Sequence, residues 1–189
     1  MKFELPREAP DSTLAAQTAP RSAEKTPPAP GSIPMTSPSK DHETVAVVLE
    51  TTLGAITVAL EVERAPVTAG NFLRYVDEDR LDGTVFYRAM WLDRDPFPNG
   101  LIQGGTQWDP DRILPGIPHE PTSVTGLSHT SGALSMAMGE PGTANGDFSI
   151  MIQDQVGLDA QPGSDDPVWK NGYAVFGYVI DGMDVVARI

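Results

Sequence analysis

Every second position is apolar in two neighbouring stretches of the chain, first at Val45, Val47 and Leu49 and then at Ile56, Val58 and Leu60. The sequence Thr52-Leu53-Gly54 lies between the two stretches. A period of two is the pattern of a strand with one buried face. The pattern therefore predicts a β-hairpin.

The period changes after this hairpin. Pro66 stands where the first turn of a helix tolerates proline, and apolar residues follow at helical spacing at Ala69, Phe72, Leu73 and Val76. The spacing predicts one amphipathic helix over roughly residues 66–77, which covers the sheet.

Short apolar stretches follow at 84–90, 100–104, 132–137, 148–152 and 173–179, separated by clusters of Gly, Pro, Asp and Asn. They predict further strands. A second helix is expected to begin after Asp181, which has the side chain of an N-cap. Many short strands with one early and one late helix are typical of a mainly β fold, a closed or nearly closed antiparallel barrel capped by two helices.

The first 43 residues differ in composition from the rest of the chain. They hold eight of the 18 prolines, with Ala, Ser, Thr and charged residues between them. Such a segment buries too little apolar surface to offset its ordering entropy. We therefore expect residues 1–43 to be a disordered Pro/Ala/Ser-rich tether and residues 44–189 to be the folded domain. A docking ligand for an SH3-like partner, or a substrate of the domain itself, remains the alternative for the tether.

Charge and composition argue against several kinds of partner and binding site. The formal net charge of -13 argues against nucleic acid and membrane surfaces as partners, and the absence of cysteine excludes disulfides and thiolate metal sites. His42, His119 and His129 lack the spacing of metal ligands, so no metal and no cofactor is expected. The N-terminus lacks the pattern of an export signal. The compartment stays open: cytoplasmic by default, periplasmic or secreted if a signal has been removed.

The candidate chemistry lies in two neighbouring apolar stretches. Arg88 is embedded in the stretch 84–90 and Gln103 in the stretch 100–104, so both side chains can point into one cleft. A guanidinium is rarely buried without a partner. Taken alone, Arg88 is equally well explained as a buried arginine satisfied by carbonyls or an acidic neighbour, and Gln103 as a strand end shaping the turn at Gly104.

The chain resembles the cyclophilin-type peptidyl-prolyl isomerases, as a bacterial-like member. The resemblance rests on six blocks in order: 49–54 with 65–72, then Phe-Tyr-Arg-Ala-Met at 86–90, Ile-Gln-Gly-Gly at 102–105, Gly-Ala-Leu-Ser-Met-Ala at 132–137, Tyr-Ala-Val-Phe-Gly at 173–177, and 181–186. Together the blocks cover roughly residues 45–189.

The resemblance implies a peptidyl-prolyl cis-trans isomerase that assists protein folding, without a cofactor, acting as a monomer on Pro-containing peptides or unfolded segments. It implies Arg88 as electrostatic catalyst and Gln103 as backbone clamp. The substrate-binding residues that it implies are Phe86, Leu101, Ala137, Phe148, Leu158 and Tyr173. A non-catalytic peptide-binding or chaperone module is the alternative.

The proline pocket departs from the family. Its expected Phe-Met pair aligns with Gly100-Leu101, a second Phe with Ser149, a Trp or Phe with Gly157, and a histidine with Tyr173. Each lost aromatic removes about 1 to 2 kcal/mol of apolar contact, so weak proline binding and low activity are expected. The resemblance further implies a last barrel strand after the helix at 181–186, and we expect two open sheet edges without it.

Overall fold

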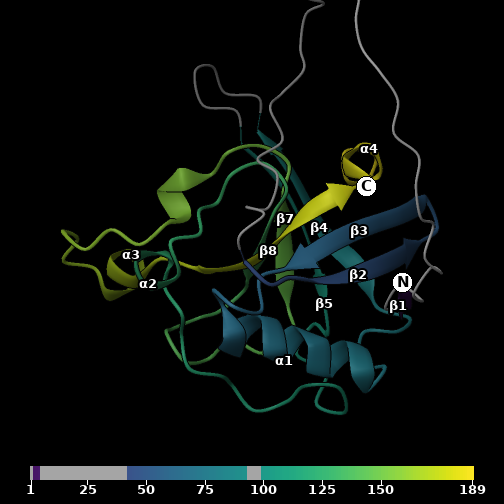
Figure 1. The fold of residues 1–189 in the computed structure, drawn as a ribbon, viewed down its shortest axis with the longest axis horizontal. Coiled ribbons are helices and arrows are strands. Elements are labelled where there is room, and N and C mark those ends of the chain that lie inside the picture. Colours follow the sequence, from purple (N-terminus) through teal and green to yellow (C-terminus); the bar gives the residue numbers. More distant parts are fainter. Residues whose placement is uncertain (1, 5–41, 93–98) are drawn as a thin grey trace, which may run out of the picture.

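A curled antiparallel sheet of eight strands forms the centre of the structure (Figure 1). The structure is a computed structural model, and it describes residues 2–4, 42–92 and 99–189. The strand order is β1-β2-β3-β8-β6-β7-β5-β4. The strands are β1 (Lys2–Glu4), β2 (Val45–Thr51), β3 (Gly54–Leu60), β4 (Val85–Leu92), β5 (Asn99–Gly105), β6 (Ala133–Met136), β7 (Phe148–Met151) and β8 (Ala174–Asp181). The mainly β, antiparallel fold class predicted from the sequence is confirmed.

The predicted hairpin is confirmed by β2 and β3, which pair antiparallel with Val47 opposite Val58. Both side chains are fully buried, as the alternating pattern requires. In the turn, the Thr51 hydroxyl donates to the Gly54 carbonyl and accepts from the Leu53 amide. The Thr51 side chain thus supplies hydrogen-bond partners to backbone groups of the turn, where the strand pairing ends.

The predicted helix is confirmed as α1 (Pro66–Asp77). It covers one end of the sheet (Figure 1) and buries Phe72, Tyr75 and Val76. The Phe72 ring lies 5.2 Å from the ring of Phe148 in an edge-to-face arrangement and 5.2 Å from that of Phe176. These aromatic contacts join the helix to β7 and β8 in one core.

The later strands lie where the sequence predicted them, but the C-terminal helix begins differently. Asp181 is the last residue of β8, opposite Thr57 of β3, so it cannot cap the helix. The chain turns at Gly182, whose φ of 89° falls in the left-handed region, and α4 (Met183–Val186) follows. A Cβ atom at Gly182 would lie 2.5 Å from the Ala55 carbonyl oxygen, so glycine permits both the turn and the close approach.

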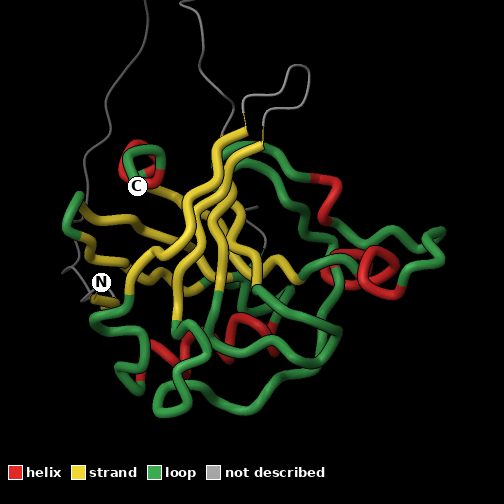
Figure 2. The backbone as a smooth tube through the Cα atoms, turned by 180° about the vertical axis from the view of Figure 1, so that it is seen from behind, coloured by secondary structure: helices red, strands yellow, loops and turns green. Residues whose placement is uncertain are grey.

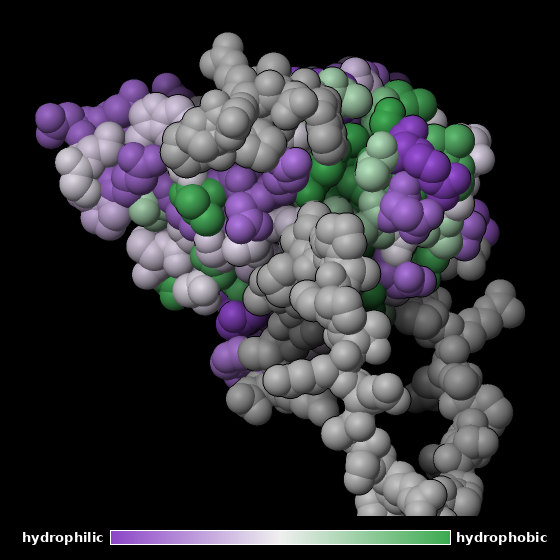
Figure 3. Space-filling view, turned by 90° about the horizontal axis from the view of Figure 1, so that it is seen from above, coloured by the Kyte–Doolittle hydropathy of each residue, from purple (hydrophilic) through white to green (hydrophobic). Residues whose placement is uncertain are grey.

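Three short helical segments were not predicted: α2 (Thr122–Thr125), the 3-10 turn η1 (Val156–Leu158) and α3 (Pro167–Asn171). They lie in the connections outside the sheet (Figure 2). Asp166 caps α3, since its carboxylate accepts from the Val168 amide. Figure 3 shows mainly hydrophilic residues over the projection that carries α3. Within the described residues, every helix is too short or too polar to cross a membrane.

The strand β1 lies inside the segment that the sequence assigned to the tether. Residues 2–4 pair antiparallel with β2, with Lys2 opposite Glu50. The outer edge of β2 presents backbone N–H and C=O groups that a short extended segment satisfies, and the proline content of the following residues gave no sign of this pairing. Residues 5–41 of the predicted tether lie outside the described residues.

Candidate active site

A groove of about 300 Å³ opens on the sheet surface next to the 3-10 turn η1. It is lined by Arg88, Met90, Leu101, Gln103, Ser135, Met136, Ala137, Met138, Ser149, Met151, Leu158 and Tyr173. Strands β4 to β7 supply most of these side chains, so the groove crosses the sheet.

Four polar residues stand in one row across four adjacent strands. Arg88 is paired with Gln103, Gln103 with Ser149, and Ser149 with Ser135. Residues directly opposite one another in an antiparallel sheet point to the same face. The register therefore brings all four side chains to the groove, although they lie far apart in the sequence.

Arg88 and Gln103 converge as the sequence predicted. Arg88 is exposed, and its guanidinium donates to the Gln103 Oε1 atom at 3.3 Å and to the Met90 sulfur at 3.6 Å. The alternative of a buried arginine satisfied inside the protein does not apply. Arg88 lines the groove, and a guanidinium has five N–H donors, so donors beyond these two contacts can serve a ligand.

Tyr87 lies beside the Gln103 carboxamide and is itself bonded to Asp147. The Tyr87 hydroxyl interacts with the Gln103 side chain and donates to the Asp147 Oδ1 atom at 3.3 Å. Burial and the Asp147 carboxylate together raise the pKa of Tyr87 to about 12. Because the oxygen of Gln103 accepts from Arg88, its NH₂ group is the end that faces the Tyr87 oxygen. The two contacts fix the orientation of the amide.

The apolar walls combine predicted and unpredicted residues. Leu101, Ala137, Leu158 and Tyr173 line the groove, as the sequence predicted. Four methionines, Met90, Met136, Met138 and Met151, line it as well. Met136 and Met151 are also part of the buried core, so they form the base of the groove.

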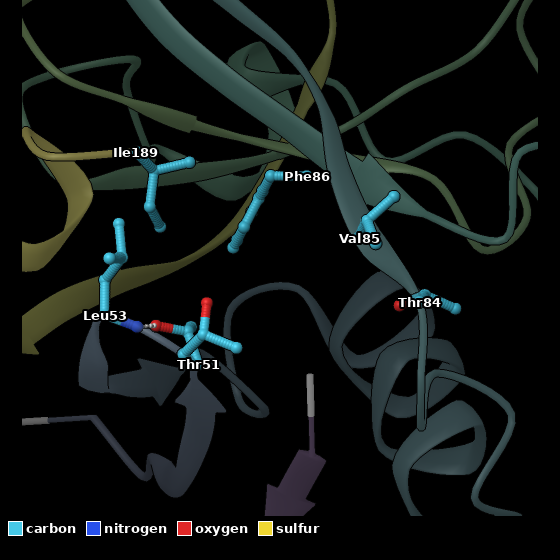
Figure 4. A pocket seen from close by; sticks show the side chains of 7 residues that line it. Thr51, Leu53, Thr84, Val85, Phe86 and Ile189 are labelled. Atoms are coloured by element: carbon cyan, nitrogen blue, oxygen red, sulfur yellow. Dashed lines mark hydrogen bonds between the residues drawn. The ribbon is translucent and has the colours of Figure 1, made fainter.

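Two predicted substrate-binding residues, Phe86 and Phe148, do not line this groove. Phe148 is fully buried in the core, because Ser149 faces the groove and neighbours in a strand face opposite sides. Phe86 lines a different hollow of about 250 Å³, where it converges with Leu53 and Ile189 (Figure 4). A register shift between Phe86 and Arg88 puts these two residues on opposite faces of β4.

Behind the groove lies a buried histidine that the sequence did not connect with it. His129 is fully buried. Its Nδ1 atom lies 2.5 Å from the Asp159 Oδ1 atom, and its Nε2 atom lies 2.9 Å from the Ser135 hydroxyl. Burial lowers the pKa of His129 more than the Asp159 carboxylate raises it. The lowered pKa favours the neutral imidazole, which donates from one ring nitrogen and accepts at the other.

Comparison with known proteins places the chain in a family. Residues 46–189 match the family described as cyclophilin type peptidyl-prolyl cis-trans isomerase/CLD. The chain belongs to the cyclophilin family. The resemblance seen in the six sequence blocks is thereby confirmed.

Three bacterial peptidyl-prolyl cis-trans isomerases are similar over most of this chain. A peptidyl-prolyl cis-trans isomerase of Acinetobacter baylyi is 36% identical over 145 residues, which cover 76% of this chain and 70% of that protein. Peptidyl-prolyl cis-trans isomerase A of Dickeya dadantii is 34% identical over 145 residues, with 76% and 70% coverage. Isomerase B of Escherichia coli is 34% identical over 152 residues, with 76% and 82% coverage.

A solved structure agrees in fold. A cyclophilin type peptidyl-prolyl cis-trans isomerase of Cryptosporidium parvum, crystallised in the presence of the dipeptide Ala-Pro, matches with a TM-score of 0.58 and 21% identity. The match covers 76% of this chain and 83% of that one.

The cyclophilin groove of this chain has a polar floor and one open wall. Ser149 and Ser135 place two hydroxyl groups at the floor. Gly157, which precedes the lining residue Leu158, has open space where a Cβ atom would stand. Among the residues that the structure describes, no group of three or more His, Cys, Asp or Glu side chains could hold a metal ion.

Proposed function

We propose that this chain is a peptidyl-prolyl cis-trans isomerase that binds Pro-containing peptide segments in the groove, with Arg88 as electrostatic catalyst and Gln103 as backbone clamp. The observation that carries the proposal is the in-register pair of Arg88 and Gln103 at the rim of an apolar groove, in a chain of the cyclophilin family. Relatives named as isomerases favour catalysis over a purely binding module.

The chemistry needs only a stabilised twisted amide. An Xaa-Pro bond rotates over a barrier of about 20 kcal/mol, because the nitrogen lone pair is delocalised into the carbonyl. The lone pair localises on nitrogen as the bond twists. An Arg88 N–H group aimed at that nitrogen binds the twisted state more strongly than either planar state, which is the condition for catalysis.

Gln103 has the complementary task. Its carboxamide offers both an acceptor and donors to the peptide backbone beside the proline. When Gln103 holds the backbone on one side of the rotating bond, the other side can turn. Part of the loss of conformational entropy then occurs on binding and not in the transition state. No nucleophile or proton transfer is required.

The Arg88→Ala variant tests the proposal. We expect the catalysed rate on an Ala-Pro peptide, followed by a protease-coupled assay, to fall about 100-fold, the typical cost of one lost electrostatic donor. Arg74→Ala is the matched control, because Arg74 is an exposed arginine on α1 that pairs with Glu78 outside the groove. Its rate is expected to equal that of the unaltered protein.

The same comparison separates catalysis from binding alone. If the unaltered protein and Arg88→Ala give equal rates while both bind the peptide, the chain is a binding module and the proposed catalysis is wrong. Arg88→Lys keeps the charge but loses the forked donor geometry, so an intermediate rate is expected for it.

A further inference from the structure

The carboxylate of Asp159 is fixed by three donors around His129. Its Oδ1 atom accepts from the His129 backbone amide at 3.0 Å and faces the His129 Nδ1 atom at 2.5 Å. Its Oδ2 atom accepts from the Ser128 hydroxyl at 2.5 Å. An ionised carboxylate accepts hydrogen bonds and cannot donate them. The hydrogen between Asp159 and His129 therefore belongs to the histidine Nδ1 atom.

This assignment sets the direction of the next hydrogen bond. A neutral imidazole that carries its hydrogen on Nδ1 has a lone pair on Nε2. The Ser135 oxygen lies 2.9 Å from Nε2, so the serine must donate its only hydrogen to the ring. Asp159 thus determines, through His129, which way the Ser135 hydroxyl points.

The Ser135 oxygen also belongs to the groove. Ser135 lines it, next to Ser149 in the row that leads to Gln103 and Arg88. Because the hydroxyl hydrogen is turned toward His129, the oxygen presents only lone pairs to the groove. A bound proline ring offers no donor to such an atom, whereas a ring that carries a hydroxyl group does.

We propose that Ser135 is a fixed hydrogen-bond acceptor on the floor of the groove, held in this role by His129 and Asp159, and that the groove prefers ligands that bring an O–H or N–H donor to this point. The ligand class is peptides whose groove residue is a hydroxylated proline or an equally compact donor-bearing residue. The inference rests on the proposed function, since it takes the groove as the site of the prolyl ring.

The three residues do not form an acyl-transfer site, although serine, histidine and aspartate stand in the order of such a relay. In that chemistry the histidine must also reach the leaving group. His129 is fully buried behind Ser135, so its Nε2 atom meets the serine and not a ligand. Ser135 also lies within β6, between β7 and β8. His129 and Asp159 are positioning residues here.

Two peptides that differ by one oxygen test the preference. Calorimetry compares an Ala-Pro peptide with the same peptide containing 4-hydroxyproline, using the full chain. We expect the hydroxylated peptide to bind about five-fold more tightly, as one net hydrogen bond allows. The preference should vanish in Ser135→Ala and persist in Ser123→Ala, which changes an exposed serine of α2 outside the groove.

The outcomes separate the two proposals. Equal affinity of both peptides for the unaltered protein, or an unchanged preference in Ser135→Ala, overturns the acceptor subsite and leaves the isomerase proposal standing. If neither peptide binds, the groove is not the peptide site and both proposals are wrong.

A second measurement needs no variant and no peptide. The ¹⁵N chemical shifts of the His129 ring report which nitrogen carries the hydrogen. We expect the Nδ1–H form at pH 7, because Asp159 accepts from that atom. A ring protonated on Nε2 would donate to Ser135 and leave the serine hydrogen free to point into the groove, and the inference would then be wrong. This measurement decides the question even if the Ser135→Ala variant does not fold.

Discussion

At the scale of single residues, the orientation of the Gln103 amide is the most sensitive feature of the groove. Arg88 donates to its oxygen, while Tyr87 interacts with the side chain and is itself bonded to Asp147. A carboxamide that rotated by half a turn would offer NH₂ to the guanidinium, which is also a donor. The contact with Tyr87 therefore protects the productive orientation.

The Tyr87→Phe variant removes this contact. We expect kcat/KM on an Ala-Pro peptide to fall about five-fold, the effect of one lost hydrogen bond of about 1 kcal/mol. Asp147→Asn should cost less. Its amide oxygen can still accept from Tyr87, and the Gln107 backbone amide, which donates to the same Oδ1 atom at 2.8 Å, holds that oxygen in place. Equal losses in both variants, or none in Tyr87→Phe, would show that Gln103 is oriented by other means.

The open wall at Gly157 leads to a second prediction at this scale. Nothing lies within 4 Å of a Cβ atom built there, and the residue adjoins Leu158 of the groove. Gly157→Trp should add an aromatic wall and tighten binding of an Ala-Pro peptide about ten-fold, from about 1 to 2 kcal/mol of new apolar contact.

A matched glycine controls for non-specific binding of the peptide to an added tryptophan. Gly163 also has open space around its Cβ position and does not line the groove. Gly163→Trp is expected to bind the peptide as the unaltered protein does. Calorimetry measures the peptide affinity of the two variants. A higher affinity in both would mean that the new tryptophan binds the peptide outside the groove.

At the scale of elements, local patterns predicted the hairpin and α1 because each pattern reports the burial of one face. The bounds of α1 agree with the expected 66–77. Phe86 lies outside the groove because β4 is irregular at this point. An even spacing from Phe86 to Arg88 places both on one face, but the register shift in β4 reverses this. Alternation alone carries no signal for such a shift.

The N-terminus of α1 depends on a residue far along the chain. The helix has no side-chain cap of its own. The Glu120 carboxylate accepts instead from the Val67 amide at 3.1 Å, the Thr68 amide at 2.6 Å and the Thr68 hydroxyl at 2.7 Å. A negative charge at this end also complements the helix dipole. Glu120 therefore joins the loop before α2 to α1.

Glu120→Ala should lower the free energy of unfolding by about 1 to 2 kcal/mol, the usual range for loss of a cap with charge-assisted hydrogen bonds. Urea unfolding measures the change. Glu140→Ala is the control, because Glu140 is exposed and lies away from α1 in the sequence. A loss of stability as large in Glu140→Ala as in Glu120→Ala would argue against the capping role.

At the scale of the whole molecule, the polar row from Arg88 to Ser135 exists only through strand order. The sequence placed Arg88 and Gln103 together because their strands follow one another. Ser149 and Ser135 join them because β7 lies between β5 and β6, and no local pattern fixes that order or its register. For the same reason the sequence did not reveal that His129 and Asp159, which lie 30 residues apart, meet behind the groove.

The same buried pair makes the stability of the whole domain depend on pH. The folded state lowers the pKa of His129, chiefly through burial, whereas in the unfolded chain the ring titrates near about 6.5. Above that pH the ring is neutral in both states, and its full contribution to stability is present. As the pH falls below about 6.5, the unfolded chain takes up a proton first, so the folded state loses stability. The loss ends once the pH is below the folded pKa.

We therefore expect the free energy of unfolding to decline as the pH falls below about 6.5, with a slope of at most about 1.4 kcal/mol per pH unit, the limit for one proton. Urea unfolding at a series of pH values measures it. His129→Gln should flatten the decline in this range, although it lowers stability overall. His42→Gln, which changes an exposed histidine beside Glu63, should leave the decline in place. A decline that persists unchanged in His129→Gln would assign it to other groups.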